Sequence, residues 1–143
     1  MRRTAAGKSL LTFLMGAYVA INALADWNQT HVFNPAWPPH ARFHIAYGSV
    51  IAWSAVAIAI WLLWRRSTEP ELGVKVALLV QLALWTPFLF LTLLVPGTSL
   101  SLGAQSPVLH VAGRVIEPQV VIAILFLLLI VWGYRLARRP STP

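Results

Sequence analysis

Residues 41–66, ARFHIAYGSVIAWSAVAIAIWLLWRR, decide the fold of this chain. Arg42 is the one charged side chain in this stretch before Arg65 and Arg66 close it. A helix that crosses the hydrocarbon core of a membrane needs about 20 mostly apolar residues. In lipid, every backbone amide must be hydrogen-bonded within its own segment, which leaves few alternatives to a helix. Ala41–Trp64 is therefore predicted to be a membrane-spanning helix.

Three more apolar stretches accompany this helix, at about residues 8–25, 72–95 and 119–136. The composition agrees with membrane spans, because the chain is 58% hydrophobic and only 10% charged, whereas a soluble domain carries about 25% charged residues. The sequence predicts one all-α domain over residues 1–143, a four-helix transmembrane bundle with up-down topology.

Several prolines are expected to set the helix boundaries. Pro87 should bend the third span, and Pro118 should interrupt or start the fourth. An unbroken helix over residues 107–136 would be about 45 Å long, which exceeds the hydrocarbon core. Pro38 and Pro39 favour a start of the second helix near residue 40, since proline is well tolerated in a first helical turn.

The basic residues predict the orientation of the chain. The net charge of +7 does not mark a nucleic-acid-binding protein, because no separate basic domain carries it. Most basic side chains instead flank the apolar stretches, at both ends of the chain and between the second and third spans. By the positive-inside rule these segments are cytoplasmic, which predicts a multi-pass protein of the cell (inner) membrane with both termini inside. The nine basic residues that flank the apolar stretches are Arg2, Arg3, Lys8, Arg65, Arg66, Lys75, Arg135, Arg138 and Arg139.

The first span has a second interpretation as a cleaved secretory signal. Arg2 and Arg3, an apolar stretch and then Ala23-Leu24-Ala25 match the basic, apolar and A-x-A parts of such a signal. Retention is the favoured interpretation, because polar residues recur every fourth position at its end, as on a helix face used in a bundle.

Ionisable side chains gather in the half of the chain opposite the predicted cytoplasmic segments. Charged groups at membrane depth are costly and by default indicate function, so a polar site near the non-cytoplasmic face is expected. Asp26, Glu117, Arg42 and Arg114 are its candidates for catalysis, although the same four could simply form neutralising pairs. All four histidines lie in this half too, and they are the candidate metal ligands: His31, His40, His44 and His110.

Helical spacing predicts how these residues would meet. One face of the second helix would carry His40, His44 and Tyr47 at positions i, i+4 and i+7. A second face would carry His110, Arg114 and Glu117, provided that this segment is helical. The first helix would add Tyr18, Asn22 and Asp26. We expect the three faces to converge, with four candidate ligand-binding residues: Asn22, Asn34, Trp37 and Tyr47.

Three functions of different classes fit this pattern. The first is binding or transformation of a lipophilic small molecule, with a Zn, Cu or Fe ion held by imidazoles and a carboxylate, or with acid–base chemistry alone. The second is haem ligation by His44 and His110. The third is a small transporter or an accessory subunit of a larger membrane complex or homo-oligomer. Transporters place polar groups at the bilayer midplane, where this chain offers mainly Gln81.

The segment His31-x-x-Asn34-Pro35-x-Trp37-Pro38-Pro39-His40-Ala41-Arg42-Phe43-His44 resembles a family of small four-helix membrane proteins found in bacteria and fungi. The four-span layout agrees over the rest of the chain. The resemblance implies no reaction, since none is established for that family. It does favour residues 31–44, which form a loop and the start of a helix, as the functional site of the protein.

Overall fold

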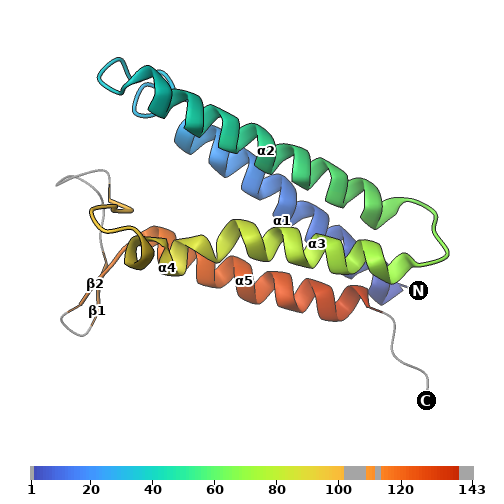
Figure 1. Cartoon of the computed structure of the whole chain (residues 1–143). Coiled ribbons are helices and arrows are strands. Elements are labelled where there is room, and N and C mark those ends of the chain that lie inside the picture. The colour runs from blue at the N-terminus through green and yellow to red at the C-terminus, as the bar shows by residue number, and fades with distance from the viewer. Residues whose placement is uncertain (1, 102–108, 112–113, 139–143) are drawn as a thin grey trace.

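The computed structural model describes residues 2–101, 109–111 and 114–138. This part of the chain forms five helices and one two-stranded sheet. Helices α1 and α2, the consecutive pair α3 and α4, and then α5 run back and forth along the molecule (Figure 1). The elements are α1 (Arg2–Asp26), α2 (Pro39–Trp64), α3 (Pro70–Trp85), α4 (Pro87–Leu94), β1 (Leu109–Val111), β2 (Arg114–Ile116) and α5 (Pro118–Ala137).

The helical, apolar character that the sequence predicts is confirmed. Helices α1, α2 and α5 are each long and apolar enough to cross a membrane, and they indicate membrane association. The expected third span, residues 72–95, is bent at Pro87 as predicted and consists of the two helices α3 and α4. They meet at an angle of 44° and together pass the same test of length and composition. Pro87 sits at the first position of α4, where its ring and missing N–H interrupt a straight helix.

Proline also fixes where the other helices begin. Pro39, Pro70 and Pro118 each occupy the first turn of a helix, where the N–H that proline lacks would have no partner within the helix. Glu117, directly before Pro118, has an extended backbone with φ −69° and ψ 133°, because the proline ring disfavours the helical conformation of the preceding residue.

The segment before α5 contains a short sheet that the sequence did not predict. Strands β1 and β2 pair antiparallel, with His110 opposite Val115 and Val111 opposite Arg114. A shared helical face of His110, Arg114 and Glu117 required a helix here, and that condition is not met. The β-branched residues of this segment favour a strand, and the extended residue before Pro118 keeps the α5 helix from extending backwards.

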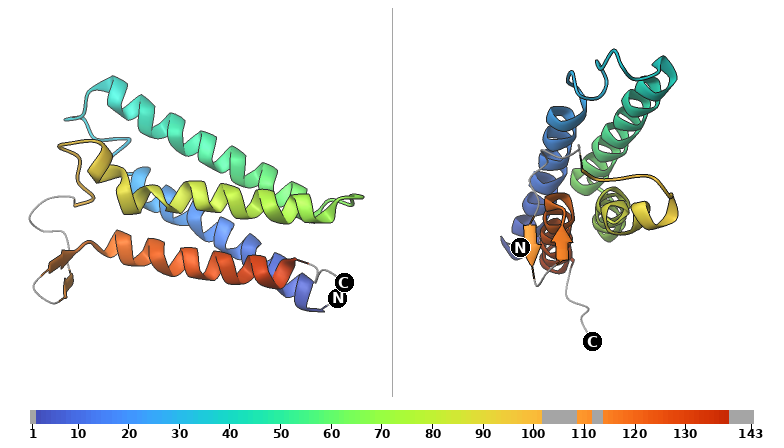
Figure 2. Two further views of the ribbon diagram at one scale, coloured as in Figure 1. Left: turned by 60° about the horizontal axis from the view of Figure 1, so that its bottom comes forward. Right: turned by 90° about the vertical axis from the view of Figure 1, so that its left-hand side faces the viewer.

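Side-chain packing is densest near the end of the molecule where α1 begins and α5 ends. Fully buried side chains there come from the first half of α1, the end of α2 and the second half of α5, and include Leu11, Leu14, Met15, Leu63 and Ile130. By contrast, none of the eight α4 residues, all of which the structure describes, is buried. Toward the other end, helices α1 and α2 accordingly diverge from helices α3 and α4 (Figures 1 and 2).

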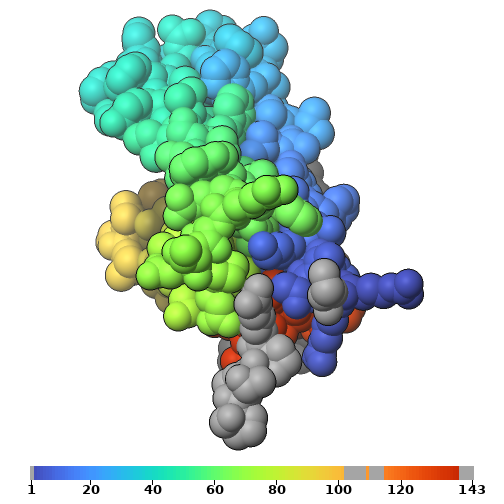
Figure 3. All heavy atoms as spheres, turned by 90° about the vertical axis from the view of Figure 1, so that its right-hand side faces the viewer, coloured from blue at the N-terminus to red at the C-terminus, as the bar shows by residue number. Residues whose placement is uncertain are grey.

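Two side chains fasten α1 to α2 at the densely packed end. The Lys8 ammonium donates to the Leu63 carbonyl over 2.7 Å, which satisfies one of the carbonyls that a helix leaves free at its C-terminus. The Trp64 indole N–H donates to the Thr12 hydroxyl over 2.8 Å. Figure 3 looks onto this end, where the start of α1 lies beside the loop between α2 and α3.

Helices α1 and α5 touch backbone to backbone at Gly7. A Cβ atom built on Gly7 would lie 2.3 Å from the Ala137 amide nitrogen and 2.7 Å from the Gly133 carbonyl oxygen. Gly133 and Ala137 are four residues apart, the small-x-x-x-small spacing that lets membrane helices approach closely. The α1–α5 crossing therefore requires that position 7 has no side chain.

We predict that Gly7→Ala lowers the free energy of unfolding by about 1–3 kcal/mol, because the new methyl group forces α1 and α5 apart. Gly16→Ala is the matched control on the same helix, since its Cβ would meet nothing within 4 Å. It should be neutral or stabilising by up to about 1 kcal/mol, as expected when alanine replaces a helical glycine. Thermal unfolding in mild detergent, followed by circular dichroism, measures both. Equal stability of the two variants would contradict the close crossing.

Candidate functional site

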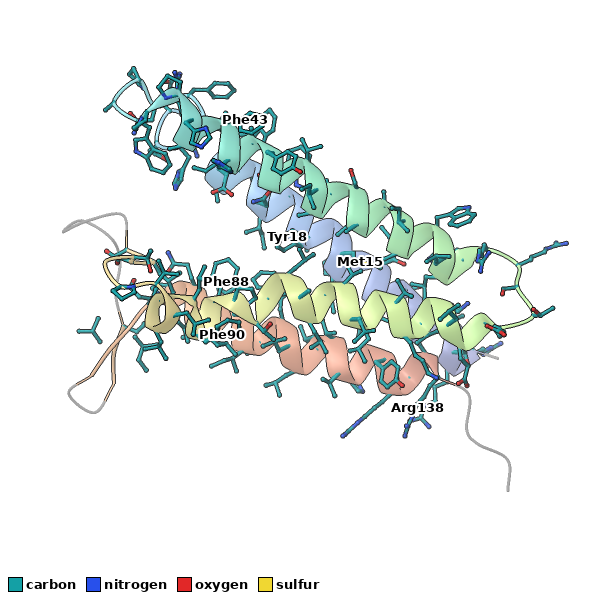
Figure 4. The ribbon with its side chains drawn as sticks, viewed as in Figure 1. Met15, Tyr18, Phe43, Phe88, Phe90 and Arg138 are labelled. Atoms are coloured by element: carbon teal, nitrogen blue, oxygen red, sulfur yellow. The ribbon has the colours of Figure 1, made fainter. Side chains whose placement is uncertain are left out.

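A pocket lies at the end of the molecule opposite the start of α1. It has a volume of about 610 Å³, which is within the usual range for small-molecule sites. The end of α1, the bend between α3 and α4, the segment after α4 and the start of α5 form its walls. Figure 4 labels Tyr18 on α1 and Phe88 on α4, two of the residues that line it from different helices.

Aromatic rings form the inner wall of this pocket. Trp85, the last residue of α3, is only 2% exposed. Its ring stacks on Phe126 of α5 with centroids 4.2 Å apart, and it meets the edge of Tyr18 at 5.6 Å. Phe88 lies 5.7 Å from the same indole across the bend. Helices α1, α3, α4 and α5 thus each contribute one ring to a single aromatic cluster.

Asp26 and Asn22 provide the polar wall on α1. The Asn22 amide donates to the Asp26 carboxylate, and its carbonyl oxygen accepts from the Trp53 indole N–H of α2 over 2.9 Å. Trp53 is held in turn by stacking on Trp27, with centroids 5.3 Å apart. A chain of contacts from α2 therefore fixes the orientation of the Asp26 side chain.

The loop after α1 brings His31 to the same pocket. Asn28 ends the helix, because its side-chain amide donates to the Leu24 and Ala25 carbonyls while its carbonyl oxygen accepts from the Thr30 amide and hydroxyl. The Thr30 hydroxyl also lies 2.8 Å from Nδ1 of His31. Asn28, Thr30 and His31 all line the pocket. This turn places the His31 imidazole on the same pocket as the Asp26 carboxylate.

Two buried polar atoms of the lining side chains have no hydrogen-bond partner in the described part of the chain. They are the Trp85 indole nitrogen, which is a donor, and the Gln119 side-chain carbonyl oxygen, which is an acceptor. The amide nitrogen of Gln119 is occupied, since it donates to the Leu100 carbonyl over 3.1 Å. Both atoms have almost no accessible surface even though the pocket is empty, so they are covered by the protein and do not face a molecule bound there.

A second, more open groove adjoins this pocket between α4 and α5. Its volume is about 650 Å³, and it shares Phe88, Ser99 and Leu100 with the first pocket. Its other walls are mostly apolar, and Glu117 lies among them with a buried, unpartnered Oε2 atom. The two spaces adjoin through these shared residues, and both are lined mainly by apolar surface.

Residues 13–142 match a family of unknown function, DUF6640. The chain belongs to that family. This membership confirms the resemblance to an uncharacterised family that residues 31–44 suggested. No curated protein and no solved structure matches the chain.

The structure of this DUF6640 member brings together part of the predicted site. Asn22, Asp26 and His31 all line the pocket, and Glu117 lines the adjoining groove. Asn34 and Trp37 do not line either space. The Asn34 side chain instead stabilises the loop between α1 and α2. Its oxygen accepts from the Ala36 amide, and its nitrogen donates to the Thr30 carbonyl. The ring of Trp37 meets the ring of His31 at 5.3 Å, so it supports a lining residue.

The predicted face of α2 lies elsewhere. His40, His44 and Tyr47 are exposed and line neither space. The Nε2 atoms of the two histidines are 2.9 Å apart, so the expected i, i+4 pair forms. Phe43 stacks on Tyr47 beside it, with centroids 5.6 Å apart, and Figure 4 shows Phe43 near the start of α2. This face does not converge with the Asn22–Asp26 wall.

The remaining candidates fall partly outside what the structure describes. No group of three His, Cys, Asp or Glu residues that could hold a metal occurs among the described residues. The side chains of His110 and Arg114 are not among those described. Arg42 forms no ion pair with a described carboxylate, and its buried Nε atom has no partner there. The expected pairing of Arg42 with an acidic residue is therefore not seen in this part of the chain.

Sequence reasoning missed Trp85, Phe88 and Gln119 as site residues. In the sequence these residues stand within or beside long apolar stretches, where aromatic groups are most often packing residues. The signal that could have drawn attention to the first two is Pro87 itself, since proline kinks a helix and both residues lie within two positions of it. Gln119 could have been noticed as a polar residue in the first turn of the last span.

Proposed function

We propose that this protein is a four-span protein of the inner membrane that binds a lipophilic small molecule near the non-cytoplasmic face. The observation that supports this most strongly is the pocket between α1, the α3–α4 bend and α5, with its aromatic inner wall around Trp85 and its polar wall at Asn22 and Asp26. Pockets for small molecules are typically apolar with a few placed polar groups.

The proposed spans are α1, α2, the bent pair α3–α4, and α5. The bent pair counts as one span because its two helices together are long and apolar enough to cross. The start of α1, the loop between α2 and α3 and the end of α5 carry the basic residues, which supports a cytoplasmic position for this end. The pocket would then face the other side of the membrane.

This orientation predicts opposite labelling of two loops. The chain has no cysteine, so Gln29→Cys and Thr68→Cys each introduce a unique, exposed thiol, one after α1 and one between α2 and α3. In intact cells, a membrane-impermeant maleimide should label Gln29→Cys fully and Thr68→Cys only after the membrane is opened. The cysteine-free parent is the control for background. Labelling of Thr68→Cys from outside would contradict the orientation.

Any chemistry in this pocket would rest on Asp26 and His31. A carboxylate and an imidazole that share one cavity can exchange protons with a bound molecule. A metal held by His40 and His44 stays a prediction, because this pair supplies two nitrogens and the candidate third ligand, His110, has no described side chain. The same holds for haem ligation by His44 and His110. Binding in the pocket is the function that the geometry supports best.

Filling the pocket should remove the bound molecule. Ala25 lines the pocket, and Ala20 lies on the same helix but does not; both are exposed. We predict that Ala25→Trp lowers the amount of lipophilic molecule bound per protein about tenfold or more, because the indole would occupy the cavity at a cost above about 1.4 kcal/mol. Ala20→Trp should leave it unchanged.

The measurement is mass spectrometry of organic extracts from protein purified in mild detergent. The wild-type protein and Ala20→Trp should carry the same species in near-stoichiometric amount. If all three proteins carry identical mixtures in equal amount, the extracted molecules are detergent-belt lipids and the pocket is not the binding site.

A further inference from the structure

Two imidazole nitrogens lie side by side on an exposed face of α2, away from the pocket. The Nε2 atoms of His40 and His44 are 2.9 Å apart, and the centroids of their rings are 4.4 Å apart. Both side chains are exposed, and neither lines the pocket or the adjoining groove. The pair is therefore accessible from outside the protein, and what it binds does not depend on the proposed binding function.

The start of α2 holds this pair in place. Pro39 opens the helix, so His40 stands in its first turn and His44 stands one turn later on the same face. The ring of Phe43 contacts both imidazoles, at 6.5 Å from the centroid of His40 and 5.7 Å from that of His44. Phe43 is itself stacked on Tyr47. These contacts restrict both imidazoles before anything binds, which lowers the entropy that binding costs.

The distance between the two nitrogens suits one shared metal ion. With a metal–imidazole distance of about 2.0–2.1 Å, as for zinc, nitrogens 2.9 Å apart subtend an angle of about 90° at the ion. A tetrahedral ion would hold them about 3.3–3.4 Å apart at the same bond length. Square-planar and tetragonal nitrogen sites are typical of Cu²⁺ and Ni²⁺, and Cu²⁺ binds such ligands more tightly than the other divalent ions of its series.

We propose that His40 and His44 chelate one Cu²⁺ ion through their Nε2 atoms. Without the ion, one ring donates its Nε2 hydrogen to the other ring. When the ion binds, the donating ring carries this hydrogen on Nδ1 instead, so both rings stay neutral and both Nε2 lone pairs point to the ion. Water completes the coordination sphere, and a third protein ligand is not required.

Copper titration of the full-length protein tests this site. The protein is purified in mild detergent with an affinity tag that contains no histidine, and CuCl₂ is added in steps. Electron paramagnetic resonance counts the nitrogens bound to Cu²⁺, and spin-echo modulation detects the remote nitrogen of each bound imidazole, which distinguishes histidine from the amino terminus. The wild-type protein should bind one Cu²⁺ per chain with two imidazoles.

Substitutions at exposed positions of α2 identify the ligands. His44→Ala should weaken Cu²⁺ binding by more than about tenfold, because even the loss of an outer-shell partner costs about 10–100-fold in metal affinity. The matched control combines His44→Tyr with Tyr47→His, which keeps the composition and exchanges two exposed residues. Its imidazoles would stand seven residues apart, about 10 Å along the axis. Since helical side chains lean in the same direction, they cannot share an ion, and binding should be as weak as in His44→Ala.

The other two histidines are controls, and His31→Ala and His110→Ala should each leave Cu²⁺ binding unchanged. The assignment is overturned if the wild-type protein binds Cu²⁺ no more tightly than His44→Ala does, in which case the pair is a hydrogen bond alone. It is also overturned if the exchanged variant binds as tightly as the wild-type protein. Loss of Cu²⁺ in His31→Ala but not in His44→Ala would place the ion in the pocket instead.

Discussion

The backbone contact between α1 and α5 at Gly7 is the constraint on which the rest of the structure depends. Because Gly7 has no side chain, its backbone lies against Gly133 and Ala137, and the helices are held together where α1 begins and α5 ends. Farther along α1, one and two helical turns after Gly7, the side chains of Leu11 and Met15 are fully buried. The tight packing at this end leaves the other ends of the helices to be joined by loops and by larger side chains. The pocket lies there.

The bend at Pro87 lies in the wall of the pocket. Helices α3 and α4 meet there at 44°, and the rings of Trp85 and Phe88 lie beside each other across it. The ring of Trp85 then joins α1 through Tyr18 and α5 through Phe126.

Much of the fold could be predicted from the sequence, because length and hydropathy nearly determine a helix in lipid. The boundaries at Pro39 and Pro118 and the bend at Pro87 also followed from single residues. The β1–β2 pair could not be predicted in this way, because each strand has only three residues and forms only by pairing with the other. In the site, Asn22, Asp26 and His31 were found because ionisable and amide groups are conspicuous near a membrane span. Trp85 and Gln119 were not found, since their position in the pocket depends on which helices meet around them. His40 and His44 do form the expected pair, but on a face of α2 that does not line the pocket.

The most direct test of the account is an experimental structure of the protein extracted from its own membrane without added ligand, by electron cryomicroscopy with a rigid fiducial or by crystallography in lipid. We expect non-protein density in the pocket between Tyr18, Trp85 and Phe88. A structure in which the end of α1 packs directly on α4 and closes this pocket would contradict the proposed binding function.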